Sequence, residues 1–252
     1  MNKREALFEY LLRQADDTLI LGQRLSEWCG HGPILEEDIA LTNIALDLIG
    51  QSTILLEYAS TLDTNNRTSD DLAFLRIEKE YKNVLLVEQT NGDFGKTIVR
   101  QFLFDQFQLL NYAQLLKSSD SQISALAEKS LKEVKYHLKH SSEWIIRLGD
   151  GTDESHMRVQ NSIDDLLRFV NELFYHDEIN DILIESKIIG DCRQFKDEYF
   201  NNLQSIIQEA TLTYPDIHYH QQGGRLGRHS ENMGYLLAEM QFMQRAYPGM
   251  EW

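Results

Sequence analysis

The sequence predicts an all-α protein built on an antiparallel four-helix bundle with additional helices. Apolar residues recur at three- and four-residue spacing along most of the chain, whereas the alternation typical of half-buried strands is almost absent. Only three prolines occur, and none lies between Pro33 and Pro215, so nothing there interrupts long helices. Four of the predicted helices would each span about 35–40 Å at about 1.5 Å per residue, which is the scale of such a bundle.

Each predicted helix ends at a polar or glycine-rich break. The first is expected over residues 3–28 and stops at CGHGP, and the second is expected over 36–62. After the polar loop that starts at Asp63, a third helical segment is predicted over 69–89, with Ser69 as its N-cap. The NGDFG turn then precedes helices predicted over 95–116 and 121–148. Shorter helices are expected over residues 163–174, 193–210 and 230–246.

Two of these helices carry an apolar seam with alternating steps of four and three residues, as bundle helices do. The seam of the second helix consists of Leu41, Ala45, Leu48, Ser52, Leu55, Ala59 and Leu62. That of the helix over 121–148 consists of Ala127, Leu131, Val134, Leu138, Ser141, Ile145 and Leu148. The longest irregular stretch is 214–229, and no linker to a second domain is recognisable. The sequence therefore predicts a single helical domain over residues 1–252.

Composition narrows the class of protein. With 252 residues, of which 42% are hydrophobic, the chain can bury a sizeable core. Its net charge of −16 argues against binding to nucleic acid or to an anionic membrane and favours a basic protein surface as partner. Two cysteines form neither a disulfide framework nor a zinc motif. Neither a signal peptide nor a run of about 20 apolar residues is recognisable, so a cytoplasmic location is expected.

Acidic residues are predicted inside the bundle on three helices. Asp47 lies within ALDLIGQ, a stretch that is apolar on nearly every side of the helix. On the helix over 95–116, Asp105 lies where the apolar stripe of Ile98, Phe102, Leu109, Tyr112 and Leu116 would have its central residue. Glu133 borders the seam of the helix over 121–148. Buried unpaired carboxylates are costly, so each is expected to have a partner or a raised pKa.

Three acids on three inner helices resemble part of a carboxylate-bridged two-metal site. Such a site takes a Glu from each of two helices and a Glu-x-x-His pair from each of the other two. The chain contains no Glu-x-x-His sequence: Gly50 follows Asp47 at that spacing, and Tyr136 follows Glu133. Because imidazole is difficult to replace at iron, we expect no metal site in this chain. Asp47, Asp105, Glu133 and Tyr136 are interpreted instead as buried polar residues of a vestigial site.

Other candidate sites carry weaker signals. One helix face could hold a metal through Glu133, His137 and His140, and the irregular segment could do so through His218, His220 and His229. In both cases ordinary surface histidines are the favoured interpretation. The glycines of QQGGRLGR, residues 221–228, lack the strand–helix context and the lysine–hydroxyl pair of a phosphate loop. Cys29 beside His31 has no third group to orient it and is interpreted as structural.

Several linked stretches are similar to one known family. They are LGQRLSEWCGHGPILEEDIALTNIALDLIGQ (21–51), NGDFGKTIVRQFLFDQFQ (91–108), KYHLKHSSEWIIRLGDGTDESHMRVQ (135–160) and HSENMGYLLAEMQFMQR (229–245). These runs closely resemble the C subunits of phenylacetyl-CoA epoxidases, the ring-activating oxygenases of bacterial phenylacetate degradation. The resemblance covers nearly the whole chain in order.

The resemblance implies a ferritin-like bundle and a place in a multicomponent monooxygenase. In that family a homologous A subunit holds the di-iron centre and binds phenylacetyl-CoA, and the C subunit lacks that centre and scaffolds the A subunit. A small B subunit bridges the assembly, and an NADPH-dependent reductase with flavin and an iron–sulfur centre delivers electrons. We therefore expect a non-catalytic structural subunit without catalytic, cofactor-binding or metal-binding residues.

Two alternatives differ in class from the structural subunit. One is an autonomous carboxylate-bridged di-iron oxidase with divergent ligands, which would bind iron on its own. The other is a helical module that binds an acyl-CoA in a vestigial pocket. A homodimer of the isolated chain is a further open alternative. In the leading interpretation, Asp47, Asp105 and Glu133 form buried hydrogen bonds or ion pairs, with a Lys or Arg where iron would lie.

Overall fold

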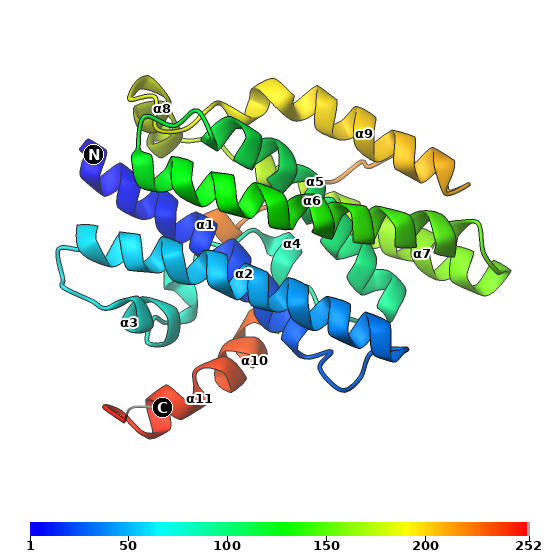
Figure 1. Cartoon of the computed structure of the whole chain (residues 1–252), viewed down its shortest axis with the longest axis horizontal. Helices are drawn as coiled ribbons and strands as arrows, with labels where there is room; N and C mark the ends of the chain where they lie inside the picture. The colour runs from blue at the N-terminus through cyan, green and yellow to red at the C-terminus, as the bar shows by residue number, and fades with distance from the viewer. Residues whose placement is uncertain (251–252) are drawn as a thin grey trace. The chain divides into compact units, whose positions relative to one another are not determined.

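The computed structural model describes residues 1–250, and within that range the chain is all-α, as the sequence predicts (Figure 1). The described residues form no strand, and their helices are consistent with a ferritin-like helical bundle. The α-helices are α1 (Lys3–Ser26), α2 (Leu35–Leu62), α3 (Ser69–Phe74), α4 (Leu85–Glu88), α5 (Phe94–Leu115), α6 (Ser121–Gly149), α7 (Asp153–Leu166), α8 (Glu178–Glu185), α9 (Lys196–Glu209), α10 (Glu231–Met240) and α11 (Phe242–Ala246). Short 3-10 helices cover Glu78–Glu80, Leu167–Phe174, Cys192–Phe195 and Gly224–Leu226.

The chain divides into two compact units. The first comprises Met1–Thr90, Asp177–Leu183 and the residues from Gly223 onward, and the second comprises Asn91–His176 and Ile184–Gln222. The expectation of a single domain over the whole chain stays a prediction.

The first unit is built on the antiparallel pair α1 and α2. The two helices approach closely at Gly22, where an added Cβ would lie 3.0 Å from Cγ1 of Ile49. The predicted seam of α2 is buried from Leu41 to Ala59. At the N-terminus of α1, Asn2 accepts a hydrogen bond from the Glu5 amide and so satisfies a backbone donor that lacks a helical partner.

The second unit is built on α5 and α6, which are also antiparallel. Asp93 caps α5, Asp120 caps α6 and Thr152 caps α7 through side-chain acceptors. Several rings of this unit pack edge-to-face or tilted in pairs that include Phe107 of α5 or Phe174, with Phe195, Tyr199 and Phe200 as the other members. The centroid separations in these pairs are 5.3–6.0 Å, which is typical of aromatic contacts. The Tyr199 hydroxyl in this group donates to the carbonyl of Leu103 at 2.9 Å.

The third predicted segment is not one helix, and this corrects the expectation for 69–89. Helix α3 ends at Phe74, and the chain then runs through a short 3-10 helix and extended residues before α4. Thr68, not Ser69, caps α3 by accepting from the Asp71 amide. The extended stretch is stabilised because buried carboxylates of α1 accept the amide protons of Lys82 and Val84, which a helix would have used internally.

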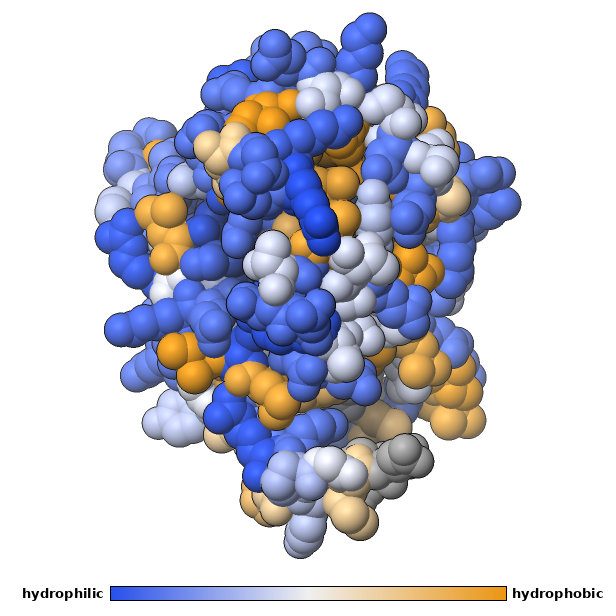
Figure 2. All heavy atoms as spheres, turned by 90° about the vertical axis from the view of Figure 1, so that its left-hand side faces the viewer, coloured by the Kyte–Doolittle hydropathy of each residue, from blue (hydrophilic) through white to orange (hydrophobic). Residues whose placement is uncertain are grey.

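Helix α2 is the one described helix that is long and apolar enough, by length and composition, to span a membrane. Half of its most apolar window is buried within the protein. Core helices of soluble proteins pass the same test, so this property is weak evidence for a membrane span. On the face drawn in Figure 2 most of the surface is hydrophilic, and hydrophobic residues form small separate groups.

Candidate functional site

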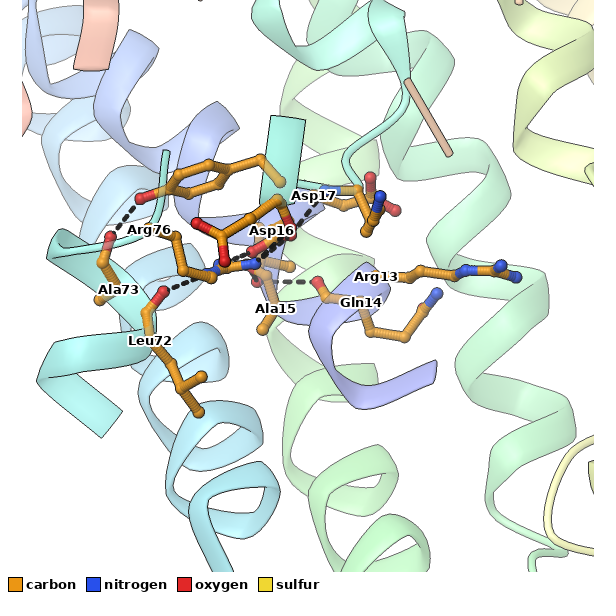
Figure 3. Close-up of polar contacts among 12 residues, drawn as sticks. Arg13, Gln14, Ala15, Asp16, Asp17, Leu72, Ala73 and Arg76 are labelled. Atoms are coloured by element: carbon orange, nitrogen blue, oxygen red, sulfur yellow. Dashed lines mark hydrogen bonds and ion pairs between the residues drawn. The ribbon is translucent and has the colours of Figure 1, made fainter. Parts of the chain in front are cut away.

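Two adjacent carboxylates of α1, Asp16 and Asp17, lie at the centre of a polar cluster in the first unit. Both are completely or almost completely buried. The Asp16 carboxylate forms an ion pair with Arg76, in which one Nη–Oδ distance is 3.0 Å, and it accepts from the Lys82 amide at 2.7 Å. Figure 3 shows the Asp16 and Arg76 side chains pointing toward each other. The Arg76 guanidinium also lies 4.2 Å from the centroid of the Tyr81 ring.

Asp17 is paired with an arginine from the C-terminal part of the chain. Arg225 donates to both carboxylate oxygens, at 2.6 and 3.0 Å, and Val84 donates its amide at 2.8 Å. The same guanidinium donates to the carbonyls of Arg13 and Lys82. Burial raises the pKa of the Asp17 carboxyl to about 6, against the opposing effect of Arg225. A bidentate buried pair of this kind fixes the relative position of the two segments.

Glu88 and His229 form a third buried pair in the first unit. The Glu88 carboxylate is 2.7 Å from Nδ1 of His229 and accepts from the Ser230 amide at 2.6 Å and from the Asn83 side chain at 3.0 Å. Nε2 of His229 lies 3.0 Å from the carbonyl of Tyr81. Burial disfavours the imidazolium, but hydrogen bonds to the carboxylate and the carbonyl outweigh it, so the pKa of His229 is raised.

The oxygens of these three carboxylates are therefore engaged by arginine, histidine and backbone donors. Asp16 and Asp17 hold Arg76, Lys82, Val84 and Arg225 against α1, and Glu88 joins the segment 76–88 to His229 and Ser230. Removing a single partner would leave a buried charge uncompensated, which is strongly destabilising. The arrangement can hold chain segments in place.

Asp105 forms a smaller polar group in the second unit. Its carboxylate accepts from Nε2 of Gln101 at 2.6 Å and from Oγ of Ser141 on α6 at 2.9 Å. Burial raises the pKa of Asp105 to about 7, although the nearby His137 and both hydrogen bonds act in the opposite direction. Asp105 is thus buried, with hydrogen-bond partners and a raised pKa. Its partners here are Gln101 and Ser141 where the sequence analysis expected a Lys or Arg, and its origin in a vestigial metal site stays a prediction.

The other predicted vestigial residues lie in different surroundings. Asp47 is partly exposed, so its predicted burial is wrong, because it lies at the border between the buried and exposed faces of α2. Glu133 is also only partly buried, with 17% of its side chain accessible, and its Oε1 lies 3.8 Å from Nζ of Lys129. Tyr136 is 51% exposed, so its predicted burial is wrong for this chain. It lies about half a turn from Val134 and a little over a quarter turn from His137, two residues of the buried stripe of α6.

The donor set near Asp105 does not fit a carboxylate-bridged di-iron centre. Residues 1–250 contain no group of three or more His, Cys, Asp or Glu side chains placed to hold a metal ion. Both oxygens of Asp105 instead accept hydrogen bonds from side chains. No chemical step through a metal bound to this chain therefore follows from these residues.

Comparison with known proteins places this structure in a family. A family model described as phenylacetic acid catabolic protein matches residues 1–252. The chain belongs to the phenylacetic acid catabolic protein family. It is 45% identical over 246 residues to the C subunit of the 1,2-phenylacetyl-CoA epoxidase of Escherichia coli strain K12, a match that covers 98% of this chain and 99% of that relative.

The glycine-rich segment of this family member has a packing role. A Cβ at Gly224 would overlap the carbonyl oxygen of Asn83, and one at Gly227 would overlap that of Lys79. Gly227 also has a φ of +72°, which favours glycine. These glycines let the backbone that carries Arg225 approach the segment 79–83 closely, so the segment is not arranged as a phosphate cradle.

Two histidines for which the sequence favours a surface position are buried. His137 on α6 is 0% exposed, and the side chain of His229 is fully buried against Glu88. His218, by contrast, is mostly exposed, with 84% of its side chain accessible. His229 is buried because the C-terminal segment from Gly223 packs against Tyr81 and Glu88. The local sequence pattern does not predict this contact.

The sequence analysis missed the cluster around Asp16 and Asp17. One signal was available: Leu12, Asp16 and Ile20 follow one another at four-residue spacing, so an acid takes an apolar position of the α1 stripe. Its partners are not predictable in this way. Arg76 and Arg225 lie 60 and 208 residues away from the carboxylates that they bind.

Proposed function

We propose that this chain is the non-catalytic structural subunit of a multicomponent 1,2-phenylacetyl-CoA epoxidase, where it scaffolds the di-iron catalytic subunit. The observation that carries the proposal is its similarity to a C subunit along nearly the full length of both chains. The match covers 98% of the chain, so the resemblance is not confined to one motif.

The engagement of the buried carboxylates supports a structural role. Asp16, Asp17 and Glu88 accept from donors that tie distant segments together, and Asp105 accepts from side chains of α5 and α6. A catalytic base or a metal ligand needs an oxygen directed at a reacting group or an ion. In our proposal the chain carries no cofactor, and di-iron resides in the catalytic partner.

The contribution of the chain to catalysis is then positional. It packs against the catalytic A subunit and holds it in a productive conformation, while the B subunit bridges the assembly and the NADPH-dependent flavin and iron–sulfur reductase supplies electrons. The proposed location is the cytoplasm. Productive geometry matters because a misplacement of about 1 Å can cost a factor of about 100 in rate.

Reconstitution of the epoxidase from purified subunits tests this proposal. Omitting the chain should abolish turnover of phenylacetyl-CoA, and adding it back should restore turnover. The Asp105→Asn variant should restore it equally well, because the carboxylate takes no part in the chemistry. Full turnover without the chain would contradict a scaffold role, and an Asp105→Asn variant that assembles normally but supports no turnover would make Asp105 a catalytic group.

A further inference from the structure

The outer face of α2 carries three large aliphatic side chains that the described chain does not cover. It consists of Leu35, Ile39, Asn43, Leu46, Gly50, Thr53 and Glu57, which lie on one side of the helix. Leu35, Ile39 and Leu46 are 72%, 53% and 61% exposed. Single exposed apolar residues are ordinary, but three large aliphatic side chains along one helical stripe indicate a contact surface.

The opposite face of α2 is already buried. Leu41, Leu48 and Leu55 on that side are between 0 and 3% exposed. Because the helix is apolar on both sides, burial against α1 uses only one of its two apolar faces. Helices that are apolar all round are normally buried completely, which here requires something outside the described chain.

Gly50 lies in the middle of the outer face. An added Cβ at Gly50 would meet no atom within 4 Å, so the glycine is not needed for packing within the chain. On α1, by contrast, Gly22 is needed, because a Cβ there would lie 3.0 Å from Ile49. A glycine within a helix is destabilising relative to alanine, and a small residue in an apolar stripe lets a second helix approach closely.

The acidic residues around the outer face indicate a binding partner with basic residues. Helix α2 contains five acidic residues and no Lys or Arg, and the whole chain has a net charge of −16. Glu36 and Glu57 are exposed beside or on the stripe, and Asp47 borders it. The acids of the first turn also favour the helix dipole, but Asp47 and Glu57 lie outside that turn. A second copy of this face or an anionic membrane would meet like charge.

We propose that the outer face of α2 binds a helix of a different protein chain, whose apolar seam is flanked by Lys or Arg and crosses α2 at Gly50. The inference rests on the proposed function in one respect: membership of a multisubunit enzyme provides such a chain. Apolar contact with Leu35, Ile39 and Leu46 provides affinity, and the basic flank pairs with Glu36 and Glu57. Interfaces of this kind combine an apolar core with a charged rim.

The test uses the full chain co-purified with the other subunits of its epoxidase. Leu46→Glu places a charge in the centre of the proposed interface, and Gly50→Gln fills the space that the partner helix would occupy. Met157→Glu is the matched control, because Met157 is 56% exposed on α7 and the change introduces the same charge. Both test positions point into solvent, so each variant should fold with the wild-type circular dichroism spectrum, and Gly50→Gln should raise the melting temperature.

We expect Leu46→Glu and Gly50→Gln to weaken assembly by about 100-fold, whereas Met157→Glu assembles like wild type. Glu57→Lys should weaken assembly less, and the loss should shrink at high salt. Wild-type assembly by both Leu46→Glu and Gly50→Gln would overturn this assignment of the surface while leaving the proposed function intact. A wild-type chain that remains separate from the other subunits would instead refute the proposed function.

Two further outcomes would also overturn the inference. One is a homodimer of the wild-type chain that Leu46→Glu dissociates, which would make a second copy the occupant. The other is binding of the wild-type chain to phosphatidylglycerol vesicles that Leu46→Glu abolishes, which would assign the face to a membrane. Analytical ultracentrifugation and vesicle flotation distinguish these outcomes from assembly with the subunits.

Discussion

The ion pair between Asp17 and Arg225 is the residue-scale feature on which the first unit depends most directly. It joins positions 208 apart in the sequence and is almost completely buried. Replacing Arg225 with Met should lower the free energy of unfolding by about 3–5 kcal/mol, because Asp17 would remain as an uncompensated buried carboxylate. Urea unfolding of the purified chain measures this change.

Arg158→Met is the control for that experiment. Arg158 pairs with Asp93 and Glu154 at the surface, where solvent screening leaves an ion pair little effect on stability. Equal losses for Arg158→Met and Arg225→Met would show that burial of the Asp17 pair contributes nothing beyond a surface contact.

Asp105 should make the stability of the chain depend on pH. Its pKa is about 7 in the fold, against an ordinary value of 3.8, so the folded state holds the proton over a range in which the unfolded chain has lost it. Stability from this group is therefore fully present below about pH 4 and falls as the pH rises to about 7. Asp105→Asn keeps the shape of the side chain without a titrating proton, so its unfolding free energy should decline less over this range.

Urea unfolding at pH 5, 6, 7 and 8 checks this prediction. Glu128→Gln is a suitable control, because Glu128 is exposed on the same helix as the hydrogen-bond partner Ser141. Parallel curves for wild type and Asp105→Asn would mean that Asp105 ionises normally in the fold.

At the scale of elements, the C-terminal segment depends on close backbone packing at Gly224. Gly224→Ala should lower stability by about 1–3 kcal/mol or more, because the added methyl group overlaps the Asn83 carbonyl. Gly234→Ala is the control: its Cβ would lie 3.5 Å from Oε2 of Glu78, an ordinary contact, and alanine should stabilise α10 by up to about 1 kcal/mol. Thermal unfolding compares the two, and equal melting temperatures would contradict the packing argument.

The spacing of apolar residues predicted the long helices well. It failed where contacts with distant residues determine the backbone conformation. Helices α1, α2, α5 and α6 begin and end within about two residues of their predicted bounds, because each carries a continuous apolar stripe and a recognisable break. The segment 69–89 also has a helical pattern. Its amides at Lys82 and Val84 instead bind Asp16 and Asp17, and no window of local sequence contains that information.

The candidate site was predictable in part for the same reason. Asp105 interrupts an apolar stripe, so its burial and raised pKa follow from the sequence. Burial of Tyr136 is expected only by analogy to a metal-binding spacing, and the helical phase relative to Val134 puts it on the exposed side of α6. The partners of Asp16 and Asp17 required the three-dimensional structure, since both arginines come from distant segments.

At the scale of the whole molecule, family membership and the internal use of carboxylates support the same proposal. The chain matches a C subunit over 98% of its length, and its buried acids hold its own segments together. In this account iron belongs to the catalytic partner, and this chain contributes surface and stability. A structural subunit and an autonomous di-iron oxidase differ most clearly in the location of the iron. It lies in the catalytic partner in the first case and in this chain in the second.

Metal analysis of the purified chain, alone and co-expressed with its catalytic partner, tests the central claim most directly. We predict iron in the complex and none in the chain alone, with the same result for Asp105→Asn. About two iron ions per chain in the isolated protein, lost in Asp105→Asn, would contradict the account and make Asp105 a ligand.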